Sequence, residues 1–152
     1  MATSSLYPYL TFTNTKEALQ YYQKTFNAQD VQRLPVTTEA ATAMNVPNNI
    51  NLDDLTMHAV FTILGVWLYA SDNFNHDEKL TNSTRLLIDI DSDDKDRFDE
   101  AMSLYEQLEN DASVNILMPL AEQNWGTKLA MLQDKYGITW MLQIRSFSAS
   151  QN

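Results

Sequence analysis

The fold is decided by the stretch Met118-Pro119-Leu120-Ala121-Glu122-Gln123-Asn124-Trp125-Gly126, followed by Lys135-Tyr136-Gly137-Ile138-Thr139-Trp140. This stretch closes the second of two halves that show the same order of predicted elements: a strand, a helix and three further strands. Gly65-Val66-Trp67 in the first half matches the Gly137 to Trp140 turn, and each begins the last strand of its half. The repeat predicts two modules, each with a sheet covered on one face by its helix.

The first half opens with Tyr7-Pro8-Tyr9-Leu10-Thr11-Phe12. Tyr9 to Thr13 is rich in aromatic and β-branched residues, which predicts a strand. Asn14 is a suitable helix N-cap, and Glu17 follows three residues later as in a capping box. The helix is expected to end near Asn27. Three strands should follow, over residues 29–36, 57–64 and 66–70, and the last two are expected to form a hairpin at Gly65.

Residues 37–56 interrupt this pattern. They are rich in Ala, Thr and Asn, contain Pro47 and have weak periodicity. They predict a long loop, called the arm below. Because so long a loop is unusual inside a compact domain, we expect the arm to cover a site or contact a partner. Its polar composition predicts that it is mobile, or ordered only against a partner subunit.

The second half repeats the pattern with an acidic segment at its first helix. Residues 85–90 predict a strand, and Asp93 or Asp94 should begin a helix. Carboxylates from Asp89 to Glu100 have the spacing of an EF-hand loop, but Asp94 stands where calcium loops need glycine. We therefore interpret the segment as a helix cap. Three further strands are expected, over 114–118, 128–133 and 139–144.

The composition limits the classes of partner. The chain has 152 residues, of which 44% are hydrophobic, enough to bury a sizeable core. We expect one domain, with a first module over about residues 6–72 and a second over about 83–147. Twenty acidic and ten basic side chains give a net charge of −10, which argues against nucleic acid and anionic membranes as partners. The chain has no cysteine, and its first residues show no secretory signal, so a cytoplasmic location is expected.

The joint order of these segments resembles the PhnB-like branch of the vicinal oxygen chelate superfamily, which includes glyoxalase I and bleomycin-resistance proteins. Trp125-Gly126 and the later Asp134 match family positions, whereas Lys128 and Ala130 stand where the family often has Arg and Gly. The resemblance covers almost the whole chain except the arm. It implies an α+β fold, with paired βαβββ modules forming a curved mixed sheet around a cavity, and a homodimer.

The resemblance also implies four positions for a divalent metal in the enzymes of the superfamily. These positions fall at or near Tyr7, at Trp67 or Tyr69, near Arg85 and near Met141. None is a usual ligand of Mg²⁺, Mn²⁺ or Fe²⁺. Possible substitutes are His58, Asp89 and Gln143. We therefore expect no metal site and no cofactor.

A cavity between the sheets would still suit a small molecule. Strand alternation places His58 on the face away from the first helix. It is either a hydrogen-bonded structural residue or a general base or ligand contact. Trp125 is interpreted as structural or pocket-lining, because indole has no titratable group in the useful range. The candidate ligand-binding residues are Tyr7, Tyr9, Thr11, His58, Trp67, Tyr69, Arg85, Trp125, Met141 and Gln143.

Three functions follow as alternatives. The leading one is a PhnB-like small-molecule-binding protein without a metal site. The second is a divalent-metal lyase or dioxygenase that uses atypical ligands. The third is a structural or interaction dimer whose cavity is vestigial, so that the candidate residues only fill the space between the sheets.

Overall fold

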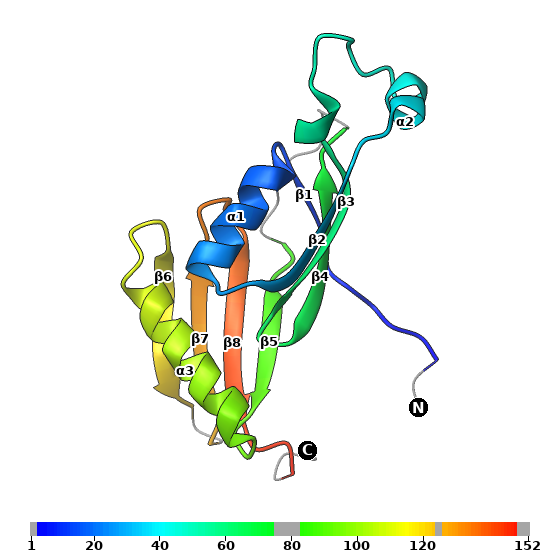
Figure 1. The fold of residues 1–152 in the computed structure, drawn as a ribbon. Helices are drawn as coiled ribbons and strands as arrows, with labels where there is room; N and C mark the ends of the chain where they lie inside the picture. The colour runs from blue at the N-terminus through cyan, green and yellow to red at the C-terminus, as the bar shows by residue number, and fades with distance from the viewer. Residues whose placement is uncertain (1–2, 75–82, 124–125, 149–152) are drawn as a thin grey trace. The chain divides into compact units, whose positions relative to one another are not determined.

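The computed structural model describes residues 3–74, 83–123 and 126–148 (Figure 1). The chain divides into two compact units, Met1–Glu78 and Lys79–Asn152. Each contains one four-stranded sheet. The predicted α+β class is confirmed, and the described strands form two mixed sheets of four.

The first unit has the predicted βαβββ order, with a short helix and a 3₁₀ turn inserted before its third strand. Its strands lie in the order β1-β4-β3-β2, with β1 parallel to β4 and the other pairs antiparallel. The elements are β1 (Tyr9–Phe12), α1 (Thr15–Thr25), β2 (Gln29–Pro35), α2 (Thr38–Ala43), η1 (Leu52–Asp54), β3 (Thr56–Ile63) and β4 (Val66–Asp72).

Helix α1 begins at the predicted cap. The Asn14 side chain accepts a hydrogen bond from the Glu17 backbone N–H at 3.1 Å. Asp72, buried at the end of β4, accepts from the Thr15 N–H at 2.8 Å and from the Thr56 N–H at 3.0 Å. One carboxylate thus joins the starts of α1 and β3 to the end of β4, and it also satisfies buried donors.

The core of this unit lies between α1 and its sheet, and α1 contacts all four strands. Tyr22 is fully buried and stacks on Phe61 of β3 with ring centroids 5.6 Å apart. Ala59 and Ile63, on the same face of β3, are also buried. Alternation therefore sends His58 to the opposite face, as predicted from the sequence.

The hairpin between β3 and β4 also forms as predicted. Ile63 pairs with Val66, so the loop has two residues, Leu64 at φ 52° and Gly65 at φ 78°. Two consecutive positive φ angles fit a type I′ turn, whose twist matches that of the flanking strands. Glycine adopts this conformation without steric cost, whereas Leu64 is strained there.

The expectation that residues 37–56 form a loop without regular structure is wrong. Thr37 caps α2 by accepting a hydrogen bond from the Ala40 N–H at 3.1 Å, and η1 follows later. Arg33 of β2 donates to the carbonyls of Leu55, at 3.2 Å, and Asp53, at 2.8 Å. Helix α2 has six residues, too few to display the apolar period by which a helix is recognised in a sequence.

The second unit repeats the topology. Its strands lie in the order β5-β8-β7-β6, with β5 parallel to β8 and the other pairs antiparallel. No helix among the described residues is long and apolar enough to cross a membrane. The elements are β5 (Leu86–Asp91), α3 (Lys95–Glu109), β6 (Asn115–Glu122), β7 (Lys128–Gln133) and β8 (Thr139–Arg145).

The acidic segment caps α3, which confirms the sequence interpretation. Asp94 is the N-cap and accepts from the Arg97 N–H at 3.0 Å, while Asp91 accepts from the Asp93 N–H at 3.0 Å. Carboxylates at this position are also favoured by the helix dipole. The helix buries Ala101, Leu104, Tyr105 and Leu108.

Candidate functional site

Aromatic side chains gather on one face of the first sheet. Tyr9 of β1 pairs in parallel with Tyr69 of β4, and the Pro8 carbonyl accepts a hydrogen bond from the Tyr69 N–H at 3.0 Å. Their neighbours Leu68 and Ala70 are buried, so alternation turns Tyr69 and Trp67 away from α1. We call this surface the aromatic face; it comprises Tyr7, Tyr9, His58, Trp67 and Tyr69.

The rings of the aromatic face contact one another closely. Tyr7 stacks on Tyr69 at a centroid distance of 4.7 Å and an interplanar angle of 10°. Tyr9 and His58 each meet Tyr69 edge-on, at 6.3 Å and 5.4 Å. The Tyr9 hydroxyl lies 3.3 Å from Nδ1 of His58, and the tautomer of His58 decides which atom donates. Stacked and edge-on contacts are both favoured for aromatic pairs, so the rings form an ordered surface.

Much of this surface is accessible to solvent. The exposed fractions are 43% for Tyr7, 52% for Tyr9 and 41% for Trp67. Large apolar side chains gathered on an exposed surface are typical of ligand or partner sites. The Tyr9–His58 pair adds a hydrogen-bonding group at its edge. The face can therefore stack a planar ligand and hydrogen bond to one of its polar atoms.

The second sheet presents different chemistry on the face away from α3. Arg145 pairs with Asp89, with Nη2 and Nε both donating to Oδ2, at 2.7 and 2.9 Å. Gln143 also donates to Asp89, at 3.2 Å. Met141 pairs directly with Leu87 on β5 and with Met131 on β7. The sequence reasoning missed Met131 and Arg145, although alternation along β7 and β8 places them on the face of Met141 and Gln143.

The structure distributes the ten candidate residues between the two units. Alternation along β1 places Thr11 on the same side as Tyr9, so the six candidates of the first unit share one region of its sheet. In the second unit, Met141 and Gln143 lie on β8, and Arg85 precedes β5 and is exposed. Trp125 lies outside the described residues.

The side chains at the metal positions implied by the superfamily do not fit a divalent metal. Tyr7 and Tyr69 stack on each other, and a phenol, an indole, a guanidinium and a thioether are poor donors for hard cations. Of the proposed substitutes, His58 is hydrogen bonded to Tyr9, and Asp89 is paired with Arg145. In the part of the chain that the structure describes, no three or more His, Asp or Glu side chains are grouped to hold a metal.

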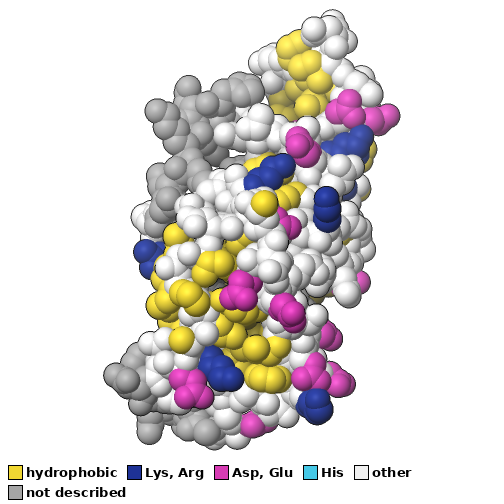
Figure 2. All heavy atoms as spheres, turned by 90° about the vertical axis from the view of Figure 1, so that its left-hand side faces the viewer, with side chains coloured by type: hydrophobic (Ala, Val, Ile, Leu, Met, Phe, Trp, Pro, Cys, Tyr) yellow, Lys and Arg dark blue, Asp and Glu magenta, His cyan; other side chains and the backbone are white. Residues whose placement is uncertain are grey.

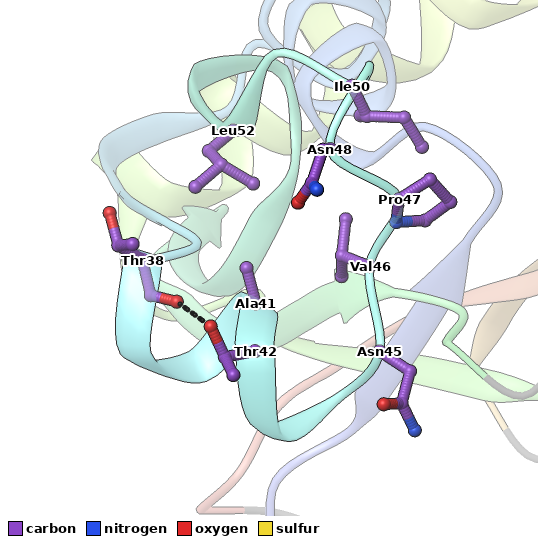
Figure 3. Close-up of a pocket in the computed structure, with 9 residues that line it drawn as sticks. All are labelled: Thr38, Ala41, Thr42, Asn45, Val46, Pro47, Asn48, Ile50 and Leu52. Atoms are coloured by element: carbon purple, nitrogen blue, oxygen red, sulfur yellow. Dashed lines mark hydrogen bonds between the residues drawn. The ribbon is translucent and has the colours of Figure 1, made fainter.

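The arm encloses a pocket of its own, of about 450 Å³ (Figure 3). Ala41 and Val46 point toward each other across it, while the Thr42 hydroxyl donates to the Thr38 carbonyl at 3.1 Å. Apolar side chains are also exposed at the top of Figure 2, where the arm lies. Every lining side chain is uncharged, which suits neutral or apolar groups: Thr38, Ala41, Thr42, Asn45, Val46, Pro47, Asn48, Ile50 and Leu52.

Comparison with known proteins identifies relatives that match most of the chain. The model of the family described as 3-demethylubiquinone-9 3-methyltransferase matches residues 4–144. Protein YjdN of Escherichia coli (strain K12) is 25% identical over 146 residues, which cover 91% of this chain and 94% of YjdN.

Solved structures share the fold at lower identity. The PhnB protein from Bacillus cereus is 22% identical with a TM-score of 0.60, covering 93% of this chain and 100% of that chain. A variant of the fosfomycin resistance protein FosX from Listeria monocytogenes, complexed with Mn(II) and 1S,2S-dihydroxypropylphosphonic acid, is 13% identical. Its TM-score is 0.61 and both chains are covered completely.

The family match spans both βαβββ units and most of the chain. The structural neighbours have glyoxalase- and bleomycin-resistance-like folds, in agreement with the resemblance found in the sequence. The chain therefore belongs to the family described as 3-demethylubiquinone-9 3-methyltransferase, a PhnB-like family of the vicinal oxygen chelate superfamily.

Proposed function

We propose that this protein binds a small molecule on its aromatic face and does so without a divalent metal. The observation that carries the proposal is the ordered and accessible cluster of Tyr7, Tyr9, His58 and Tyr69. A surface without a binding role would not be expected to keep several large exposed rings in contact, because exposed apolar clusters favour aggregation. The cluster suits a planar, mainly apolar ligand that carries one hydrogen-bonding group.

The charge of the protein argues against a phosphonate as the ligand of the aromatic face. The FosX variant was crystallised with Mn(II) and a phosphonic acid. A phosphonate dianion needs cations around it, from metal, Arg or Lys. The aromatic face consists of phenol, indole and imidazole groups, and the chain carries a net charge of −10. On this face, which includes no Arg or Lys, a neutral ligand avoids the electrostatic cost that an anion would meet.

The proposal is tested by thermal unfolding and by quenching of tryptophan fluorescence. The probes are 1-naphthol, as a planar neutral molecule, and methylphosphonate, as an anion. A ligand that binds only the folded state raises the unfolding temperature. We expect 1-naphthol to raise it and methylphosphonate to leave it unchanged, with or without added Mn²⁺. No stabilisation by 1-naphthol would contradict binding at this face.

A matched pair of variants locates the site. Tyr69→Leu removes the ring that contacts three others, whereas Phe74→Leu removes an exposed ring that lies outside the aromatic face. Affinity for 1-naphthol should fall roughly tenfold in Tyr69→Leu, because stacking contributes about 1 kcal/mol per ring pair beyond the buried area. Phe74→Leu should bind as the wild type does.

Metal independence is tested separately by elemental analysis of protein purified without chelator. Titrations with Mn²⁺, Ni²⁺, Zn²⁺ and Fe²⁺ at moderate salt complete the test. Weak binding to surface carboxylates is expected from the net charge of −10 and decides nothing. One tightly held ion per chain, lost in His58→Leu or Gln143→Leu, would replace this proposal with the metal-dependent enzyme.

We also propose that the protein forms a homodimer in which the arm contributes contacts. The arm exposes Ile50 and encloses an uncharged pocket, so burying it against a second copy removes apolar surface from water. Light scattering should give the mass of a dimer. Replacing residues 38–53 with a short Gly-Ser linker should shift that mass toward the monomer, while an unchanged dimer would exclude this role for the arm.

A further inference from the structure

An apolar row crosses the whole second sheet on the face away from α3. Leu87 of β5 pairs with Met141 of β8, Met141 with Met131 of β7, and Met131 with Met118 of β6. Side chains on directly paired residues share a face and lie side by side. We call these four residues the methionine row. Neighbouring strands lie about 4.8 Å apart, so the row is roughly 14 Å long.

Polar residues border the row on both sides. On one side Gln133 pairs with both Thr139 and Asn115, which places three polar residues next to one another. On the other side Asp89 pairs with Gln143 over β5 and β8. The apolar strip is therefore one residue wide over β5 and β8. It widens over β7 and β6, where Leu129 pairs with Ala121.

This width decides the kind of occupant. A stable protein interface buries about 800 Å² on each partner around a broad apolar core, and a strip that is one residue wide over half of the sheet cannot supply that. A linear aliphatic chain can lie along such a strip. Methionine suits this task because its unbranched, polarizable side chain adapts to an occupant of irregular shape.

A basic residue precedes the β5 end of the row in the chain. Arg85 directly precedes β5 and is exposed, two residues before Leu87 in an alternating segment. Arg145, in contrast, is held by Asp89 in an ion pair of 2.7 Å. Guanidinium groups pair well with carboxylates. The carboxylate of an aliphatic ligand could thus pair with Arg85 at the β5 end of the row.

We propose that the open face of the second sheet binds an unbranched aliphatic carboxylate. Its chain lies along the methionine row and its carboxylate lies beside Arg85. The inference goes beyond the proposed function, which places a small molecule on the aromatic face of the first unit. It assigns a second ligand class to the second unit.

The test compares three probes by calorimetric titration of the full-length protein, below the concentrations at which they form micelles. Decanoate has the chain and the charge, decanol has the chain alone, and 1-adamantanecarboxylate has the charge on a bulky body. We expect decanoate to bind most tightly, decanol more weakly and 1-adamantanecarboxylate not measurably. Equal binding of decanoate and 1-adamantanecarboxylate would overturn the linear site, and equal binding of decanoate and decanol would overturn the role of Arg85.

Two variants of Met131 test whether the aliphatic ligand contacts the methionine row. Met131→Gln keeps the length of the side chain but inserts an amide, which should weaken decanoate binding roughly tenfold because the amide loses water without gaining a partner. Met131→Leu keeps the volume and should bind decanoate within about twofold of the wild type. Equal affinity of Met131→Gln and the wild type would overturn the assignment, provided that the variant unfolds at the wild-type temperature.

Tyr69→Leu separates this inference from the proposed function. It should leave decanoate binding unchanged, because Tyr69 belongs to the first sheet. Binding of 1-naphthol without any binding of decanoate would overturn only the present inference. Binding of neither probe would overturn the proposed function as well.

Discussion

The open faces of the two sheets differ far more than the faces that carry the helices. Both units use the same strand order, with the first strand parallel to the last. Toward the helices, both pack aliphatic and aromatic side chains, with Tyr22 buried in one unit and Trp140 in the other. Away from them, one unit shows stacked rings and the other a row of thioethers. Packing against the helix restricts which side chains the covered face of each sheet can carry, whereas the open face can carry side chains of different chemistry.

This difference predicts two kinds of binding from one topology. Rings such as Tyr7 and Tyr69 are rigid and keep their stacked geometry. Met131 and Met141 have three rotatable bonds each and can adjust to an occupant. The aromatic face should therefore select for the shape of a ligand, and the methionine row mainly for apolar length.

The largest expected effect tests whether each unit depends on a buried aspartate for its stability. Each has a buried aspartate at a strand end. Asp134 accepts from the Tyr136 and Ile138 N–H groups, at 2.8 and 3.1 Å, and from the Trp140 indole at 2.9 Å. Asp134→Ala leaves these donors without that acceptor and should cost about 4 kcal/mol of unfolding free energy.

Asp72→Ala, in the first unit, should cost less, about 3 kcal/mol, because its carboxylate accepts hydrogen bonds from two N–H groups, those of Thr15 and Thr56. The measurement is urea unfolding followed by circular dichroism. Asp54→Ala is the matched control, since Asp54 forms an exposed ion pair with Lys16 worth under about 1 kcal/mol. A loss in Asp134→Ala no greater than in this control would show that the buried carboxylate does not organise the turn.

The next effect sharpens the contrast between rigid and adaptable faces. Trp67→Leu and Met141→Leu each put a leucine on an open face. On the aromatic face the change should weaken 1-naphthol binding about fivefold, because a flat ring is lost. On the methionine row it should change decanoate binding less than twofold, because volume and apolarity are kept. Titration of both variants with both probes checks this, and equal losses on the two faces would remove the distinction.

The fold followed from the sequence wherever local signals agreed with long-range packing. Asn14, and either Asp93 or Asp94, were expected to begin helices because each precedes an apolar stripe of helical period, and the structure shows Asn14 and Asp94 as the caps. Helix α2 was missed because its six residues are too short to show such a stripe. The hairpin at Gly65 was predicted because glycine marks a turn, and the structure shows that this turn has the positive φ angles of type I′.

The candidate sites were harder to predict because they depend on register. Alternation alone gave the direction of His58, but its hydrogen bond to Tyr9 requires β1 to lie beside β4 in one particular register. The methionine row requires three strand pairings at once, including a shift in register between Ile116 and Met118. A single sequence carries no local signal for such pairings.

A smaller effect concerns the arm. The arm is expected to exchange its amide hydrogens faster than either sheet, because α2 is short and most of its residues are exposed. Hydrogen exchange measured by mass spectrometry checks this against peptides from β3 and β7. Strong protection throughout residues 37–55 in a proven monomer would contradict it, while protection that appears only in a dimer would support the proposed contact.

The smallest effect tests how the edge of the second sheet is closed. The Tyr105 hydroxyl accepts a hydrogen bond from the Leu120 N–H of edge strand β6 at 2.9 Å, next to Pro119, which has no N–H. Burial raises the pKa of Tyr105, and the neighbouring Glu109 raises it further, while the bond from Leu120 lowers it. Tyr105→Phe should cost about 1 kcal/mol at neutral pH.

Because the folded-state pKa of Tyr105 is raised, its neutral form contributes stability that is complete below the ordinary tyrosine value. That contribution is lost as pH rises through the folded-state pKa. The stability gap between the wild type and Tyr105→Phe should therefore narrow at alkaline pH, which urea unfolding at neutral pH and at about pH 10.5 would show. Tyr21→Phe serves as the control for alkaline effects common to tyrosines. A gap that stays constant, or widens, with rising pH would contradict a buried hydroxyl that closes this edge.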